Sequence, residues 1–154
     1  MIGPQFRHNR SRPEDVLAHL TICDAAFTPP LSLRVALPDY AAKLVARAER
    51  FEMWENQTLV GLVAVYCDSA ERDCAFVTSV SVLPNLTRAG LGRRLLEEAI
   101  THVRDLGFRR LALHVDRRAA ALRLYCRLGF TADAGAGEVL YLSLDCLHSP
   151  EQRP

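Results

Sequence analysis

Two glycines and several arginines crowd the expected start of a helix near the middle of the chain. The segment 85–98 reads NLTRAGLGRRLLEE, with Gly90 and Gly92 lying between Arg88 and Arg93. A helix start carries partial positive charge, so arginines there are unfavourable unless an anion is close by. Glycines allow backbone N–H groups to approach such an anion without a Cβ in the way. The segment therefore predicts a loop that binds a diphosphate, which supplies the missing negative charge.

This glycine loop matches neither of the two common nucleotide-binding signatures. Leu95 stands where the dinucleotide fingerprint GxGxxG needs its third glycine, and no GK[ST] follows as a P-loop requires. A bare GxG is equally compatible with an ordinary turn that leads into a helix with solvated arginines. A second segment has to decide between these two interpretations.

The second segment carries a tyrosine within an apolar helical pattern. It reads AALRLYCRLGF at 120–130, and Leu124, Tyr125 and Leu128 fall on one face of the expected helix. Taken alone, this pattern predicts a packed helix with a buried tyrosine. Neighbouring residues on a helix point about 100° apart, so Cys126 is expected to pack elsewhere and not to act as a nucleophile beside Tyr125.

Apolar periodicity predicts the elements that would position these two segments. Helices are expected over 12–27, 39–50, 91–106 and 117–128. Strands are expected over 3–10, 50–56, 58–68, 73–84 and 109–116, followed by a final hairpin within 131–146. The strands 73–84 and 109–116 are joined through a helix, so they should lie parallel, with a ligand beyond their carboxyl ends.

Composition limits the classes of protein and of partner. The 154 residues, 49% hydrophobic and 24% charged, fit one domain over 1–147 with a flexible tail over 148–154. A formal net charge of +1 favours neither a nucleic-acid nor a membrane partner. The five cysteines lie far apart without metal-ligand spacing, which predicts reduced thiols and no metal site. Without a signal peptide or membrane-length apolar run, the chain is expected to be cytoplasmic, as a monomer or homodimer.

Together the two segments resemble those of the GNAT-type N-acetyltransferases. That family has a strand ending in a "V.P" step before "[QR]xxGxG", and later an "N..A..lYeklGF" helix; here these read VSVLPNLTRAGLGRRLL (80–96) and RAAALRLYCRLGF (118–130). Thr87 replaces the usual Gln or Arg, and Arg118 the frequent Asn. The resemblance covers at least 50–145. It implies an α/β fold with a mixed, mainly antiparallel sheet of six to seven strands, about four flanking helices and splayed central parallel strands.

The resemblance implies acetyl-CoA as the acetyl donor. Its pyrophosphate would lie on the backbone amides of the glycine loop, and its pantetheine would pair like an added strand with the backbone before that loop. Arg118 would reach a phosphate. The implied donor-binding residues are Val80, Ser81, Val82, Arg88, Ala89, Gly90, Leu91, Gly92, Arg93, Arg118 and Tyr125.

Acetyl transfer to an amine needs a proton for the departing thiolate and a base for the amine. The resemblance implies that Tyr125 is the general acid, and an unperturbed phenol with a pKa near ~10 keeps its proton at neutral pH. The strand before the loop carries no carboxylate, so the expected relay is a water held by Thr78, Ser79 and Ser81. The alternative bases are Glu52, Glu55 and His114.

The acceptor leaves the weakest signal in the sequence. The resemblance places it beside the segment 28–37, where Arg34 would bind an acidic group, while Trp54, Tyr66 or His114 would line the site. The sequence has no acidic run that would bind a basic peptide as the acceptor. The expected acceptor is therefore a primary amine of a small molecule or amino sugar, with a protein N-terminus or lysine as the alternative. A second hypothesis is a non-catalytic module that binds acyl-CoA as a sensor.

Overall fold

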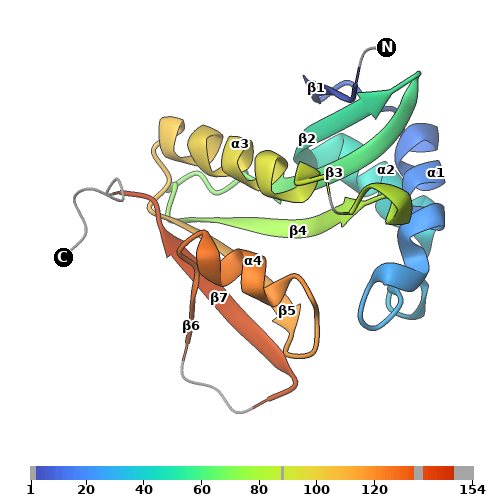
Figure 1. Ribbon diagram of the computed structural model, residues 1–154. Coiled ribbons are helices and arrows are strands. Elements are labelled where there is room, and N and C mark those ends of the chain that lie inside the picture. Colours follow the sequence, from blue (N-terminus) through green and yellow to red (C-terminus); the bar gives the residue numbers. More distant parts are fainter. Residues whose placement is uncertain (1–2, 88, 134–136, 148–154) are drawn as a thin grey trace.

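The computed structural model contains one seven-stranded mixed sheet in the order β1-β2-β3-β4-β5-β7-β6 (Figure 1). Its strands are β1 (Gln5–His8), β2 (Ala48–Glu55), β3 (Thr58–Tyr66), β4 (Cys74–Val82), β5 (Arg110–Asp116), β6 (Thr131–Ala132) and β7 (Val139–Asp145). All neighbouring strands are antiparallel except β4 and β5. The structure describes residues 3–87, 89–133 and 137–147, so the predictions made for Arg88 and for the tail 148–154 lie outside it.

Four helices cover the two faces of this sheet (Figure 1). They are α1 (Pro13–Cys23), α2 (Leu37–Arg47), α3 (Leu91–Asp105) and α4 (Leu122–Arg127). Successive residues of a strand point to opposite faces. Accordingly, Val63 and Val65 of β3 pack with α3 and α4, whereas Leu62 and Ala64 pack with α1 and α2. The α/β fold class expected from the resemblance is confirmed.

Helix α3 holds the glycine loop against the sheet. Its buried residues Leu95, Ala99 and Val103 recur every four positions and form the apolar face that the sequence predicted. The helix approaches β3 closely, because a Cβ added at Gly61 would lie 3.1 Å from a methyl group of Leu95. Gly107 follows the helix with a positive φ of 86°, as its predicted role in ending the helix requires.

Three predicted helix boundaries are wrong. Helix α1 ends at Cys23, where the chain tightens into a 3₁₀ turn over Asp24–Ala26. Helix α2 ends at Arg47, since the following residues already pair with β3. Helix α4 begins only at Leu122.

The late start of α4 comes from the Asp116 side chain. Its carboxylate accepts the backbone N–H of Arg118, and its backbone carbonyl accepts the N–H of Ala119, so the chain forms a turn there. Among the described residues, no helix is both long and apolar enough to cross a membrane.

Candidate active site

The two parallel strands separate partway along their length. β4 pairs with β5 only from Cys74 to Val77, against Arg110 to Leu113. Beyond that point β4 remains paired with β3, and β5 remains paired with β7, so the strands diverge (Figure 1). In the described chain, the β5-facing backbone groups of 78–82 therefore have no ladder partner on β5. An extended ligand can pair with such groups as an added strand does.

A bulge lies where the strands begin to separate. Val65 pairs with Val77 and Ala64 with Ser79, so Thr78 has no partner on β3. The hydroxyl of Tyr40 on α2 holds this bulge, at 2.6 Å from Thr78 Oγ1 and 2.9 Å from the Thr78 carbonyl. Bulges re-aim side chains and backbone groups next to functional sites. Sequence reasoning missed Tyr40, because neither a bulge nor its distant partner leaves a local signal.

The three hydroxyls expected to hold a water differ in their surroundings. The Thr78 hydroxyl is bonded to Tyr40, and the Ser81 hydroxyl lies 2.8 Å from His19 Nε2. The Ser79 hydroxyl is buried and has no partner in hydrogen-bonding geometry among the described residues. It nevertheless lies close enough to the Tyr40 hydroxyl to lower the pKa of Tyr40. Ser79 is therefore the hydroxyl of the three that remains available to a water or a substrate.

His19 of α1 is a buried residue that sequence reasoning also missed. Its Nδ1 lies 2.9 Å from the carbonyl of Leu59, so Nδ1 carries the proton and Nε2 accepts from the Ser81 hydroxyl. The pKa of His19 is lowered, mainly because burial disfavours the charged imidazolium. The imidazole is therefore held neutral between α1 and the sheet.

This buried imidazole should make the protein less stable in mild acid. Below pH ~6.5 the unfolded chain gains a proton on His19 that the folded chain resists, so the stability present at neutral pH is lost as the pH falls. We expect His19→Gln to reduce the pH dependence of the free energy of unfolding, by up to about 1.4 kcal/mol per pH unit. Urea unfolding of both proteins at pH 5, 6 and 7 measures this. Identical pH dependence would show that His19 does not resist protonation.

Tyr125 lies on the other face of the sheet. It belongs to the core formed with α3 and α4, is 6% exposed, and packs edge-on against Phe130 at 6.0 Å between ring centroids. Burial raises the pKa of Tyr125 to about 12, so the phenol keeps its proton throughout the neutral range. Cys126 is exposed, so the prediction that it packs is wrong. The expected difference in direction between the two side chains is confirmed.

The glycine loop has the backbone geometry of an anion site. Gly90 precedes α3 with a φ of 75°, and a Cβ there would meet nothing within 4 Å. Leu91, Gly92 and Arg93 occupy the first turn, whose N–H groups lack partners within the helix. The N–H of Ala89 already donates to the Leu86 carbonyl at 3.1 Å, so it is not available to a ligand in this conformation.

Of the three arginines expected to contact phosphate, the structure describes Arg93 and Arg118, and both have partners of their own. Arg93 lies 3.7 Å from Glu97, and both side chains are more than half exposed, so this pair is easily exchanged for a ligand. Arg118 donates to both carboxylate oxygens of Asp116, at 3.0 and 2.9 Å. These hydrogen bonds lower the pKa of Asp116 to about 2. A phosphate would have to share Arg118 with that carboxylate.

Glu52 and Trp54 belong to a separate buried network on β2. The fully buried Glu52 carboxylate accepts from the backbone N–H groups of Arg10 and Ser11 and from the indole N–H of Trp54, and it lies 3.4 Å from Arg50. This network ties the N-terminal segment to the sheet. β3 separates it from β4, so the structure does not bring Glu52 or Trp54 together with Thr78.

An aromatic row crosses the open sheet face on the side of α1 and α2. His114 comes directly after Leu113, the last residue of β5 that pairs with β4. Its ring centroid lies 5.2 Å from that of Phe76 on β4 and 5.4 Å from that of Tyr141 on β7. Tyr66 pairs with Phe76 from β3. Arg34 lies close enough to Tyr40 for its charge to oppose the rise in the Tyr40 pKa that burial causes. His114 and Arg34 thus both lie on the α1 and α2 side of the sheet.

Comparisons with known proteins identify the same architecture. The model of the Acetyltransferase (GNAT) family matches residues 19–130. A Desulfovibrio desulfuricans structure described as a GNAT-family acetyltransferase is 24% identical, with a TM-score of 0.74, and the match covers 94% of this chain and 99% of that one. No curated protein sequence matches the chain.

Two further solved structures have ligands in their descriptions. YncA of Salmonella typhimurium, described as an acetyltransferase with its cofactor acetyl-CoA, is 22% identical with a TM-score of 0.74, over 97% of both chains. The PaiA N-acetyltransferase of Thermoplasma acidophilum in complex with coenzyme A is 13% identical with a TM-score of 0.72, over 92% of this chain and 99% of that one. At these identities, the likeness concerns the fold.

Proposed function

Because the chain belongs to the GNAT family of acetyltransferases, we propose that it transfers the acetyl group of acetyl-CoA to a primary amine of a small molecule or amino sugar. The observation that carries this proposal is the early end of the β4–β5 ladder, at Val77 and Leu113, on the strand that leads into the glycine loop. That gap offers unpaired backbone to a pantetheine arm and leads to the first turn of α3.

The donor lies along the separated part of β4. Its pantetheine amides pair with the backbone of Val80, Ser81 and Val82, and its pyrophosphate accepts from the N–H groups of Gly92 and Arg93. Gly92 suits this close approach, because the nearest atom to an added Cβ would be a Val82 methyl at an ordinary 3.7 Å, so the glycine is not needed for packing. The role of Arg118 is to hold a phosphate oxygen while it keeps its contact with Asp116.

The acid and the acceptor side lie on opposite faces of the sheet. Tyr125 packs in the core on the α3 and α4 face, whereas Tyr40, which holds Thr78, packs on the α1 and α2 face. This arrangement supports direct attack, in which the amine approaches from one face and the thiolate leaves toward the other.

In the proposed reaction the amine attacks the thioester carbonyl of acetyl-CoA directly. The neutral amine forms the new C–N bond while a backbone N–H of 80–82 stabilises the charge that develops on the carbonyl oxygen. The C–S bond breaks, and the thiolate takes the phenol proton of Tyr125. The extra amine proton passes to a water at the Ser79 hydroxyl, with His114 as the alternative base. The products are an N-acetylated amine and CoA, and solvent returns the proton to Tyr125.

The aromatic row supports an amine with an apolar or ring-shaped body. Phe76, His114 and Tyr141 offer ring faces beside the start of the gap, and such faces bind both apolar groups and ammonium groups. Arg34 is then placed to bind an acidic group at the far end of the acceptor. Trp54 donates its indole N–H to Glu52 in the separate network on β2, so of the predicted acceptor residues it has the least support.

The experiment that tests this function follows thioester loss from acetyl-CoA with a panel of small amines and amino sugars. Amine-dependent release of CoA is expected, with mass spectrometry of the acetylated product. Binding of acetyl-CoA without release, for every amine and for peptide N-termini and lysines, would instead support a non-catalytic acyl-CoA sensor.

Direct attack also predicts how Cys126 behaves. Cys126 is exposed while its neighbour Tyr125 is buried, so the two cannot serve one thioester together. We expect Cys126→Ala to keep its rate of acetylation, and wild-type protein incubated with acetyl-CoA alone to gain no acetyl group in intact-mass measurements. Because Cys126 is an exposed thiol, it is the residue to check for acetylation at the protein surface. Peptide mapping must therefore locate any acetyl group that the intact-mass measurement detects. A stoichiometric thioester on Cys126 that an amine then discharges would overturn the direct mechanism.

A further inference from the structure

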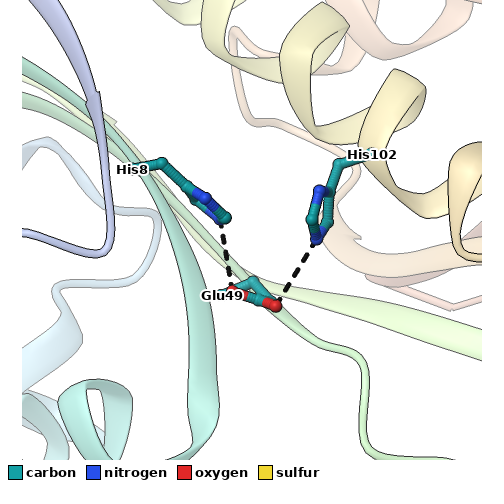
Figure 2. Close-up of side chains that lie close together, drawn as sticks. All are labelled: His8, Glu49 and His102. Atoms are coloured by element: carbon teal, nitrogen blue, oxygen red, sulfur yellow. Dashed lines mark ion pairs between the residues drawn. The ribbon is translucent and has the colours of Figure 1, made fainter.

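Two histidines and one glutamate meet far from the gap between β4 and β5. His8 ends β1, Glu49 lies near the start of β2, and His102 lies in the last turn of α3. Figure 2 shows the two imidazole rings directed toward the Glu49 carboxylate from β1 and from α3. His102 follows Gly90 by twelve positions along α3, which places the cluster about 18 Å along the helix axis from the glycine loop.

The distances within this cluster are short enough for its three residues to share one zinc ion. His8 Nε2 lies 3.2 Å from Glu49 Oε2, and His102 Nε2 lies 3.4 Å from Glu49 Oε1. Ligand atoms at typical zinc bond lengths of about 2.0–2.1 Å and tetrahedral angles are separated by about 3.3–3.4 Å. One nitrogen from each histidine and one carboxylate oxygen all lie within 4.8 Å of one another. Small side-chain movements would place all three around one ion.

The two ring nitrogens are shielded from solvent without being satisfied. Among the described residues, His8 Nε2 and His102 Nε2 have no partner in hydrogen-bonding geometry, despite their proximity to the carboxylate. Buried polar atoms normally have a partner, so each such atom requires an explanation. A lone pair directed at a metal ion explains both nitrogens at once.

The surroundings hold the three ligands in position. Asn9 donates from its side chain to Glu49, and the backbone N–H of Arg50 donates to Asn9 Oδ1 at 2.7 Å. The Phe51 ring packs against both imidazoles, with centroids 4.9 Å from His8 and 5.4 Å from His102. Supporting contacts of this kind orient metal ligands and tune their affinity.

We propose that His8, Glu49 and His102 form a zinc site that ties β1 and β2 to the end of α3. The donor set of two imidazoles and one carboxylate suits Zn²⁺, and it carries a single negative charge against the two positive charges of the ion. A recess of about 360 Å³ lies beside Glu49 and is lined also by Cys67 and Asp68. The site is structural, because it joins an edge strand to a helix and lies away from the acetyl-transfer residues. The spacing of the cysteines in the sequence gives no sign of this site, because none of its ligands is a cysteine.

The test uses full-length protein freed of metal by a chelator and then titrated with Zn²⁺. We expect saturable binding of one ion per chain and a rise in Tm of roughly 5–10 °C at Zn²⁺ about 100-fold above its Kd. Mg²⁺, which prefers oxygen ligands, should give no shift. Co²⁺ in place of Zn²⁺ should give the visible absorption of a low-symmetry site with nitrogen ligands.

Matched variants locate the ion. His8→Asn, Glu49→Gln and His102→Asn should each lose the stoichiometric binding, whereas His114→Asn and Glu98→Gln, exposed residues outside the cluster, should retain it. A measurement on wild-type protein avoids any folding defect: Zn²⁺ should shift the imidazole NMR resonances of His8 and His102, but not those of His114. Failure of wild-type protein to bind one Zn²⁺, unchanged binding in the cluster variants, or absence of these shifts would each reduce the cluster to two ion pairs and overturn the proposal.

Discussion

Tyr125→Phe is expected to lower kcat by ~10²–10⁴-fold, the usual contribution of a general acid, and to leave the Kd for CoA nearly unchanged. The substitution keeps the ring and its packing against Phe130, so it removes only the hydroxyl group and with it the phenol proton. Without that proton, the C–S bond must break to a free thiolate in a buried environment. Turnover with any accepting amine and CoA binding by calorimetry measure the two quantities.

Stability separates this role from a structural one. A buried hydroxyl that only holds the fold would cost about 1–3 kcal/mol of unfolding free energy when its hydrogen bond is lost. The Tyr125 hydroxyl makes no hydrogen bond among the described residues, so Tyr125→Phe should change Tm little. Because burial raises the pKa of Tyr125 to about 12, its ionisation should not lower activity between pH 7 and 10. Reduced stability with undiminished kcat would assign the proton to another group.

The sequence predicted the fold where an apolar pattern is long and local. The repeat from Leu91 to Val103 identified α3, and alternation identified β2, β3 and β4. It failed where one side chain decides a boundary, as Asp116 does ahead of α4. Such a boundary depends on a hydrogen bond that competes with the helix, and composition does not report it.

The site was predictable to the extent that its parts are contiguous in the chain. The glycine loop and the Tyr125 helix each form one segment, so their geometry follows from local sequence. The Thr78 bulge, Tyr40 and His19 are linked to the candidate site by contacts between distant segments, such as Tyr40 to Thr78 and His19 to Ser81. The His8, Glu49 and His102 cluster depends in the same way on the packing of β1 and α3. These contacts exist only after the chain has folded, so no spacing in the sequence encodes them.

Gly90→Val is expected to weaken CoA binding by roughly 10- to 150-fold, the value of one lost hydrogen bond to a charged group. Gly90 has a φ of 75°, where a residue with a Cβ is strained by about 1–2 kcal/mol. Relief of this strain would turn the loop and misalign the first N–H groups of α3 from the pyrophosphate. The Tm rise that CoA causes in the wild-type protein should then disappear at the same CoA concentration.

Gly107→Val provides the matched control for this effect. Gly107 follows the other end of α3 with a similar φ of 86°, and an added Cβ would approach only the Arg72 side chain, at 4.0 Å. Both variants therefore suffer the same kind of backbone strain and a comparable loss of unfolding free energy, but Gly107 lies a helix length away from the proposed pyrophosphate position. We expect Gly107→Val to keep the full Tm rise with CoA, while dephosphorylated pantetheine should give much less stabilisation than CoA in every variant. Equal stabilisation by CoA of wild-type, Gly90→Val and Gly107→Val proteins would show that the glycine loop does not bind the diphosphate. Loss of the shift in both variants would assign the effect to strain in α3, not to contact with the ligand.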